Sequence, residues 1–408
     1  MKLRPFLILL AVMVLLAIPW LVSSSMLNAA IQMLIAALFA MAFSLLCGQA
    51  GMLSFGHAAY FGLGAFATVH AMNAFNGEGL LPTPLLPLAG AAVGLVSGVV
   101  AGYFSTKRTG VYFAMITLAL AELLHALAPH LKGTFGGEAG ISSFRMPAWG
   151  FGFGTAIEVY YLTLFWVLLA IGLLYLLMLT PLGRLALGLR ENQRRLRFLG
   201  YNVHALGTLI FAISAMFSGL AGALQSLNIE AANYAELETH VSTVVLLNSF
   251  IGGVRVFLGP AIGAALMTFF GHVTSDVTRV WLLYQGIIFV LVMMFLPRGI
   301  VGELVERFSG KRPAGEGIRL SEMLPRLAGI AVAALGGVVL IELLQRVMSR
   351  DYRALAAGGQ WPEITMMGLS WQPGSPLTWL VPLSALALGL ALVLGVNRRA
   401  AARREATA

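Results

Sequence analysis

Few residues in this chain have the chemistry to carry protons, and Glu122 and His125 are the most suggestive pair. Their spacing of three places both side chains on one face of a helix, within or near the outer end of an apolar segment. Ionisable groups inside a membrane are costly and usually functional, so the pair could relay protons. Pro129 and His130 follow directly, however, which favours a position in the outer membrane interface without such a role.

Recognisable catalytic signatures are absent from the sequence. It contains no glycine-rich phosphate loop ending in Gly-Lys-Ser or Gly-Lys-Thr, no HExxH and no GxSxG. The 7 histidines are not clustered at metal-ligand spacing, and the single cysteine, Cys47, excludes an intrachain disulfide and a cysteine-only metal site. We therefore expect no bond-making chemistry, no catalytic residue and no bound metal on this chain.

The composition predicts the environment of these residues. Hydrophobic residues make up 59% of the chain and charged residues 11%, whereas a soluble domain carries about 25% charged residues. This composition indicates an all-α protein, a polytopic transmembrane helical bundle. The net charge of +9 could suggest nucleic acid, but the basic residues fall in loops that flank apolar segments, so we expect the lipid bilayer as the partner.

Apolar segments of about 20 residues, the length that crosses a bilayer, recur along the chain. We predict spans at 5–22, 27–47, 52–72, 85–105, 110–128, 160–180, 206–228, 238–251, 256–275, 280–296, 327–346 and 377–396. The first resembles a signal peptide, but other spans follow at once, and we interpret it as an uncleaved helix. The eighth is short, and Gly252, Gly253 and Gly259-Pro260 interrupt its continuation, so a broken or re-entrant element is expected there.

The basic residues also predict sidedness. With the N-terminus inside, most of the 26 lysines and arginines fall in inner loops, as the positive-inside rule requires, and both termini are cytoplasmic. We expect a permease-like core of about ten helices over 1–302, with a cytoplasmic loop at 181–205. A charged cytoplasmic linker over 303–326 and an additional two-helix hairpin with a basic tail over 327–408 would follow.

Residues 184–204 form an arginine-rich island between two apolar segments. Arg184, Arg190, Arg194, Arg195 and Arg197 share it with a single acid, Glu191, and apolar residues such as Leu196 and Phe198 alternate with the charges. This pattern predicts a short amphipathic helix, followed by a turn at Leu199-Gly200. The pattern alone allows two roles, which are anchoring at the membrane surface and docking of a cytosolic partner.

Two stretches are dense in glycine, residues 48–66 and 251–266. Glycine lets membrane helices pack closely, or unwind where they line a cavity, and broken helices point to a translocation path. Close packing explains the GxxxG steps of Gly94, Gly98 and Gly102. For the first stretch we favour a pathway, because it holds polar residues at membrane depth. The candidate pathway residues are Gly48, Gln49, Gly51, Ser54, Gly56, His57, Gly252, Gly253, Gly259 and Pro260.

Two further polar residues interrupt apolar segments, Asn248 and Gln285. Polar side chains inside membrane helices commonly bond to a neighbouring helix. We predict interhelical hydrogen bonds for both rather than contacts with a transported solute.

Several segments together carry a family resemblance: GQAGMLSFGHAAYFGLGAF, RENQRRLRFLGYNV followed by FAISAMFSGLAGAL, IGGVRVFLGPAIGAAL and FLPRGIVG. In this order, across roughly residues 25–302, they resemble the inner-membrane permease subunits of branched-chain amino acid ABC importers. Importers of urea, amides and aromatic acids use similar permeases, so the resemblance fixes the substrate less well than the family. The chain departs from the pattern at its end, since such permeases usually finish near PRGIVG, and we assign no role to the additional hairpin.

The resemblance implies a half-channel that pairs with a second homologous permease. Two cytosolic ATPases would bind ATP and Mg, with no cofactor on this chain, and a periplasmic binding protein would deliver the small-molecule solute, Leu, Ile or Val. The family's coupling helix would fall on Arg190–Gly200, where Leu196 and Phe198 would fill an apolar pocket of the ATPase. The implied coupling residues are Arg190, Glu191, Asn192, Arg194, Arg195, Phe198 and Gly200.

A different class of function remains open on the residues themselves. A secondary transporter or channel driven by an ion gradient would use Glu122 and His125 as its proton pair. A structural scaffold is disfavoured, because it has no need of glycine-broken segments and polar groups at mid-membrane.

Overall fold

A computed structural model describes residues 3–75, 81–308, 320–356, 361–366 and 369–407. The predicted fold class is confirmed, since the chain is an all-α helical bundle. Among the described residues, 8 helices are long and apolar enough to cross a membrane. The short strands pair only locally, β1 (Ile141–Ser142) with β2 (Ala231–Ala232) and β3 (Ile364–Met366) with β4 (Leu369–Trp371).

Most helices coincide with the predicted spans. The long ones are α1 (Leu3–Leu21), α2 (Ser24–Ser44), α3 (His57–Phe75), α4 (Pro87–Ser105), α5 (Val111–Leu127), α7 (Ala156–Leu179), α8 (Pro181–Phe198), α9 (Val203–Ile229), α10 (Thr239–Gly252), α11 (Gly259–Ser275), α12 (Trp281–Phe295), α14 (Leu320–Met348) and α16 (Pro376–Thr407). The shorter elements are η1 (Leu45–Gln49), η2 (Thr83–Leu85), η3 (Ala128–His130), α6 (Lys132–Phe135), η4 (Gly137–Ala139), η5 (Tyr234–Leu237), α13 (Gly299–Phe308) and α15 (Arg350–Ala356).

Three boundaries differ from the predicted ones for local reasons. The third span begins at His57 rather than at residue 52, because the backbone turns at Gly51, whose φ is +70°. Helix α7 begins early, at Ala156, where Thr155 and Glu158 form a reciprocal capping box. The predicted linker at 303–326 is helical at both ends, in α13 and α14, and its residues 309–319 lie outside the described chain.

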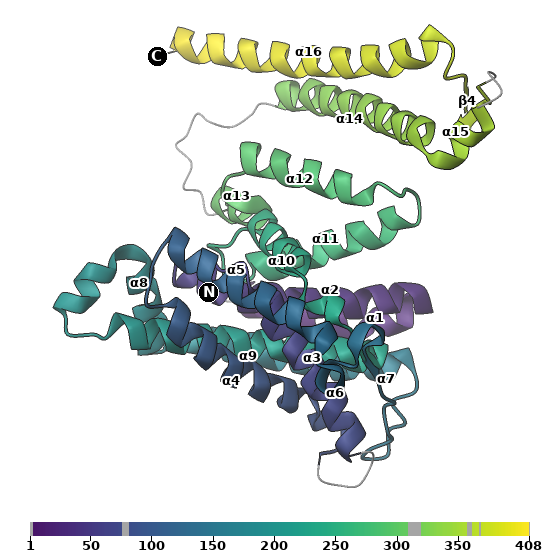
Figure 1. The fold of residues 1–408 in the computed structure, drawn as a ribbon. Coiled ribbons are helices and arrows are strands. Elements are labelled where there is room, and N and C mark those ends of the chain that lie inside the picture. Colours follow the sequence, from purple (N-terminus) through teal and green to yellow (C-terminus); the bar gives the residue numbers. More distant parts are fainter. Residues whose placement is uncertain (1–2, 76–80, 309–319, 357–360, 367–368, 408) are drawn as a thin grey trace. The chain divides into compact units, whose positions relative to one another are not determined.

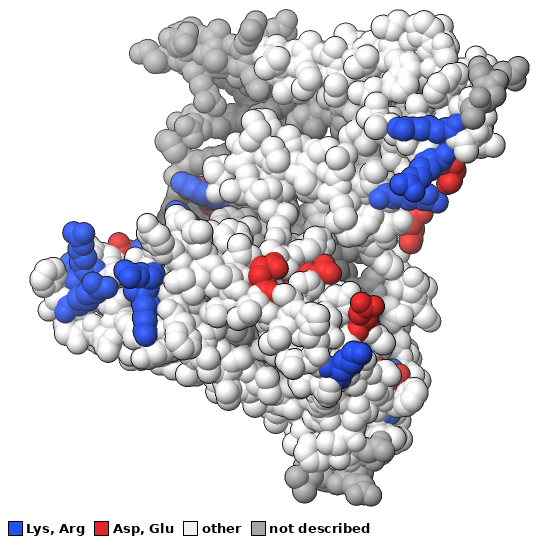
Figure 2. Space-filling view, in the orientation of Figure 1, with Lys and Arg blue, Asp and Glu red and all other residues white. Residues whose placement is uncertain are grey.

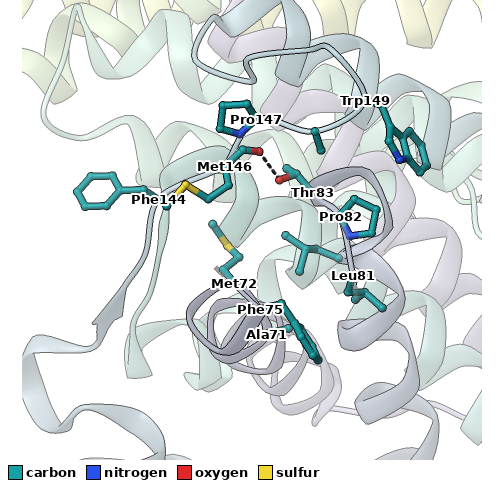
Figure 3. Close-up of a pocket in the computed structure, with 12 residues that line it drawn as sticks. Ala71, Met72, Phe75, Leu81, Pro82, Thr83, Phe144, Met146, Pro147 and Trp149 are labelled. Atoms are coloured by element: carbon teal, nitrogen blue, oxygen red, sulfur yellow. Dashed lines mark hydrogen bonds between the residues drawn. The ribbon is translucent and has the colours of Figure 1, made fainter. Parts of the chain in front are cut away.

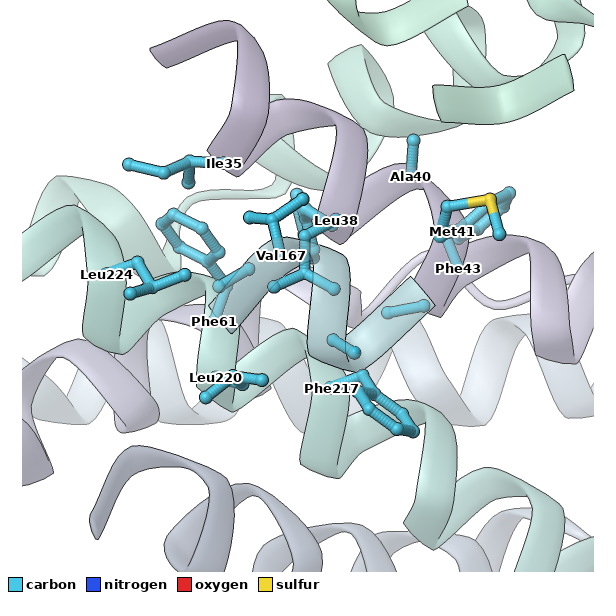
Figure 4. Close-up of a cluster of buried hydrophobic side chains, with 14 of the residues drawn as sticks. Ile35, Leu38, Ala40, Met41, Phe43, Phe61, Val167, Phe217, Leu220 and Leu224 are labelled. Carbon is cyan, nitrogen blue, oxygen red and sulfur yellow. The ribbon is translucent and has the colours of Figure 1, made fainter. Parts of the chain in front are cut away.

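Two compact units make up the chain, one of residues 1–274 and 282–309 and the other of 275–281 and 310–408. In the second unit α14 packs along α16, and Val339, Leu343, Tyr352 and Ile364 form a small core. In the first unit the core lies between α2, α3, α7 and α9. There Leu38, Phe61, Val167 and Leu224 interdigitate (Figure 4), and the van der Waals contacts between such side chains favour the packed arrangement.

Glycines bring three helices of the first unit into backbone contact. Helices α3 and α4 run beside α9 (Figure 1). A Cβ at Gly94 would lie 2.5 Å from the carbonyl oxygen of Ala215, and one at Gly102 would press on Phe211. The predicted packing role of the GxxxG steps is therefore confirmed, as is usual for small residues at membrane helix interfaces.

The first unit has two distinct ends, with α8 at one and α6 near the other (Figure 1). At the α6 end, Arg145 holds the end of α9. Its Nη1 donates to the carbonyl oxygens of Leu227 and Asn228 at 2.7 and 3.2 Å, and its Nε lies 3.2 Å from a carboxylate oxygen of Glu230. The guanidinium satisfies carbonyls that the helix itself cannot, so it fixes this end of α9.

Candidate functional site

The arginine-rich island forms α8, which has two helical segments. Thr180 caps the first, accepting from the amide of Gly183, and Pro181 occupies the first turn. At Asn192 the backbone leaves helical geometry (φ −162°, ψ 96°), and its Oδ1 accepts from the amide of Arg195 at 3.0 Å. Asn192 therefore ends one segment and caps the next.

The turn after α8 has the predicted form. Gly200 has a φ of +87°, its amide donates to the carbonyl of Arg197, and the amide of Tyr201 donates to that of Leu196. Glycine is favoured at such a position because it adopts positive φ without a steric cost. Asn202 then caps α9 by accepting from the amide of Ala205 at 3.0 Å. The island is thus a short helix and a tight turn into the next span.

The two faces of α8 differ in exposure. Ala186, Leu189 and Leu196 are buried against the unit. Phe198 is 92% exposed, and a shallow hollow beside it is lined by Asn192, Arg194, Arg195 and Leu199. Glu191 and Gly200 are also exposed. Figure 2 shows basic side chains gathered at this end of the molecule. An exposed aromatic ring among cations is the composition of a protein-binding hot spot.

The expectation for Leu196 was wrong. It is only 6% exposed and lies against Gly188, so it cannot enter a pocket of another protein. The break at Asn192 is the physical reason, because it folds the second segment of α8 back on the first. The exposed face of this helix end is formed by Glu191, Asn192, Arg194, Arg195, Phe198, Leu199 and Gly200, and we call it the α8 face.

Arg190 is half-buried and turned toward the rest of the unit, unlike its neighbours on the α8 face. Its Nη1 donates to the carbonyl oxygen of Gly48 at 2.6 Å. A Cβ added at Gly51 would lie 2.9 Å from Cγ of Arg190. The first glycine stretch and the arginine island, which are far apart in the sequence, therefore meet at the base of α8.

The second glycine stretch reaches the same place. The hydroxyl of Ser44 donates to the carbonyl of Val254 at 3.4 Å, and a Cβ at Gly48 would overlap that oxygen. Gly253 (φ +108°) and Gly299 (φ +76°) touch through their backbones. We call Gly48, Gly51, Gly253 and Gly299 the glycine junction. The predicted break between α10 and α11 is present, with Gly252, Gly259 and Gly263 in close backbone contact and Pro260 in the first turn of α11.

The polar candidates of the first stretch lie inside the helix bundle. His57 and Ser54 have no exposed surface in the single chain. Nε2 of His57 lies 2.9 Å from Oγ of Ser214, which itself donates to the carbonyl of Ala42 at 2.6 Å. Oγ of Ser54 accepts from the amide of Gly56 at 3.2 Å, and Gln49 is half-buried. A pathway role for these residues stays a prediction.

The remaining polar candidates have partners on neighbouring elements. Nε2 of Gln285 donates to Oδ1 of Asn248 at 3.1 Å, which confirms the predicted interhelical hydrogen bond. Glu122 is exposed and accepts from the hydroxyl of Thr239 at the start of α10. The ring of His125 lies 5.8 Å from that of Tyr234. Glu122 and His125 therefore contact the first residue of α10 and the preceding η5, respectively.

The sequence did not reveal a pocket at the other end of the first unit. This pocket has a volume of about 220 Å³ and lies between the end of α3, η2 and the loop over 144–149 (Figure 3). Thr83 closes one side by donating to the carbonyl of Met146 at 2.6 Å. Trp149 and Gly150 both have positive φ, in a two-residue turn bridged between Ala148 and Phe151. A tryptophan in that conformation is unusual, so Trp149 itself does not predict this turn.

Glu236, in η5 outside the apolar helices, has a buried Oε2 without a hydrogen-bond partner. Burial raises the pKa of this carboxyl from its usual 4.5 to about 8. The folded chain then binds this proton more tightly than the unfolded chain does. The stability that this bound proton contributes to the folded chain is complete below about pH 4.5 and is lost as the pH rises through about 8.

We expect Glu236→Gln to raise the melting temperature of the purified protein near pH 8 and to leave it almost unchanged near pH 5. The amide keeps the shape of the protonated acid and cannot ionise. Thermal unfolding in detergent at the two pH values measures the effect, with Glu138→Gln, on an exposed acid, as the control. Equal pH dependence in the wild type and Glu236→Gln would contradict the burial argument.

Comparison with known proteins gives matches over most of the first unit. The family described as the permease component of the branched-chain amino acid transport system matches residues 25–297, which include α2 to α12. The high-affinity branched-chain amino acid transport system permease protein LivM of Salmonella typhimurium is 26% identical over 312 residues, 69% of this chain and 71% of that protein. Its Escherichia coli namesake is 26% identical over 328 residues, 73% and 75% of the two chains.

The name of another relative indicates a sugar as its solute. The ribose import permease protein RbsC of Haemophilus influenzae is 25% identical over 201 residues, which cover 47% of this chain and 59% of that protein. No solved structure matches the chain.

Proposed function

From the premise that this multi-pass membrane protein belongs to the branched-chain amino acid transport permease family, we propose that it is one transmembrane subunit of an ATP-driven importer for leucine, isoleucine and valine. The names of the LivM relatives support the substrate class. The importer would lie in a bacterial inner membrane. The distribution of lysine and arginine favours α8 and both termini on the cytoplasmic side.

The proposed assembly has four kinds of partner. These are a second homologous permease, two cytosolic ATPases that hold ATP and Mg, a periplasmic binding protein, and the solute. The observation that carries the proposal is the α8 face, where Phe198 is 92% exposed beside Arg194 and Arg195. Such a face suits an acidic groove with an apolar pocket on an ATPase, since aromatic and arginine anchors dominate protein interfaces.

The proposed mechanism is a shift between two conformations. Closure of the ATPases on ATP would displace α8, and the displacement would reach α2, α10 and α13 at the glycine junction. The ATPases can drive this only if they bind the two conformations with different affinity. The candidate pathway residues from Gly48 to His57 and from Gly252 to Pro260 would then open or close the path as their helices move.

The energy source distinguishes this proposal from an ion-driven transporter. We expect uptake of labelled leucine by intact cells to persist when a protonophore collapses the proton gradient while ATP is maintained. We also expect Glu122→Gln to keep most of the uptake, because the amide still accepts from Thr239 and no proton needs to move through it. Uptake that stops with the gradient, or with Glu122→Gln, would favour the ion-driven alternative.

The substrate needs a separate test, because the match to a ribose permease shows that relatives carry different solutes. Unlabelled leucine, isoleucine and valine should compete with labelled leucine for uptake, and urea, short amides, phenylalanine and ribose should not. Competition by one of the latter in place of the aliphatic amino acids would keep the importer class and change its substrate.

A further inference from the structure

Movement of α8 reaches α7 and α9 through the chain itself, but it can reach the other membrane helices only through contacts that do not slide. Its buried apolar residues, Ala186, Leu189 and Leu196, give non-directional contacts that can shift in register. Among the hydrogen bonds of the described residues of α8, the one from Arg190 to the carbonyl of Gly48 joins the helix to a distant segment. At 2.6 Å and from a charged donor, it is of the strong, geometrically specific kind.

The acceptor lies where α2 loses its regular form. Residues 45–49 form a π-helical turn, with the amide of Ala50 donating to the carbonyl of Leu45 and that of Met52 to Leu46. Such turns are rare and are frequent at functional sites. The last carbonyls of a helix lack partners within it, and a cation is favoured there. The guanidinium of Arg190 therefore acts as the cap of α2, supplied by another helix.

From Gly48 the contact continues through backbone atoms. Gly48 lies against the carbonyl of Val254, which Ser44 also holds, in the turn after α10. The adjacent Gly253 abuts Arg298 and Gly299, at the start of α13. Backbone atoms have no rotamers that could absorb a displacement, and packed elements tend to switch between discrete arrangements. A shift at Gly48 is thus passed to two other helix ends.

We propose that Arg190 is a positioning residue that transmits the movement of α8 to the glycine junction through the carbonyl of Gly48, and does not itself contact the ATPase. The resemblance had placed Arg190 with the ATPase-coupling residues of the α8 face. Its half-buried position and its bond to Gly48 assign it instead to the other side of α8. This inference rests on the proposed function, because it presumes that an ATPase moves α8.

The single cysteine of the chain provides a reporter of the junction. Cys47 is half-buried, next to Gly48, and close enough to Arg190 to interact with its charge. The experiment measures how fast a small maleimide modifies Cys47 in the complete transporter, with partner subunits made cysteine-free, in membranes without nucleotide and after trapping with ATP and vanadate. Leucine uptake and retention of the ATPases are measured on the same membranes.

In the wild type we expect the modification rate to differ between the two nucleotide states. Arg190→Met keeps a long side chain without a donor, and should remove this difference and lower uptake about 10-fold or more, the effect of losing a charge-assisted hydrogen bond, while the ATPases stay bound. Arg190→Lys keeps a charged donor and should preserve both readouts in large part. Arg184→Ala removes an exposed arginine from the first turn of α8 and should change neither.

The outcomes separate the two proposals. A wild-type complex that retains no ATPase, or takes up no leucine with ATP, defeats the proposed function. Normal uptake and normal nucleotide-dependent labelling in Arg190→Met overturn only the role of Arg190, as does an Arg190→Lys variant as defective as Arg190→Met. If Arg190→Met fails to reach the membrane, Arg190→Ala, which also lacks a donor, takes its place, with uncoupling supporting the proposal and unchanged coupling overturning it.

Discussion

Replacement of Phe198 by alanine is expected to release the ATPases from the membrane subunit and to abolish most ATP-driven uptake. Phe198 is 92% exposed at the end of α8, so its truncation removes an anchor without opening a cavity in this chain. Truncating a hot-spot aromatic weakens binding by about 2–4 kcal/mol, or about 30- to 700-fold. Co-purification of the ATPases with the detergent-solubilised permease, over a range of ATPase concentrations, measures the loss.

The matched control is Phe144→Ala. Phe144 is also a largely exposed phenylalanine, 76% exposed, but it belongs to the loop at the other end of the first unit. It should leave ATPase retention unchanged, and both variants should accumulate in the membrane like the wild type. Retention of the ATPases by Phe198→Ala at wild-type affinity would remove the α8 face from the interface and leave membrane anchoring as its role.

Replacement of Gly222 by alanine is expected to destabilise the first unit severely. A Cβ at this position would overlap the carbonyl oxygen of Phe61, where α9 crosses α3. A backbone oxygen cannot rotate away, so the helices must separate. Overpacking costs about 1–3 kcal/mol or more, and here the separation would also loosen the neighbouring side chains of the core. Thermal unfolding in detergent and the fraction of monodisperse protein measure the effect.

Gly172→Ala provides the contrast within the same unit. Gly172 lies within α7 with no atom within 4 Å of the added Cβ. Alanine is the better helix former by about 0.8–1.0 kcal/mol, so this variant should be as stable as the wild type or slightly more stable. If Gly222→Ala and Gly172→Ala melt alike, the close approach of α3 and α9 is not essential for the fold.

The sequence predicted the helices well because their information is local. A run of about 20 apolar residues must satisfy its own backbone hydrogen bonds in a membrane, and only a helix does so within one segment. The island, the turn at Gly200 and the break before α11 were predicted for the same reason. Each depends on the conformational preferences of a few adjacent residues, such as Gly200 with its positive φ.

The orientation of side chains was less predictable. Leu196 and Phe198 have similar character and are two residues apart, which places them on opposite faces of a helix. The non-helical backbone of Asn192 sets the direction of this second segment, so that Leu196 lies inward and Phe198 outward. Likewise, the sequence placed Arg190 with the other arginines, because nothing local indicates that Gly48 supplies an acceptor 142 residues away. Hydrophobic periodicity carries no information about long-range pairings of this kind.

The two fixed ends of α9 have a geometric consequence. A helix of 27 residues is about 40 Å long, and Asn202 caps one end while Arg145 clamps the other. A capped helix of this kind does not change its length, so a sideways displacement of one end tilts the whole helix. A rotation of about 5° sweeps the far tip through about 3.5 Å over that length, roughly the size of a methyl group. A small displacement of α9 on one side of the membrane can thereby move its other end by a similar amount.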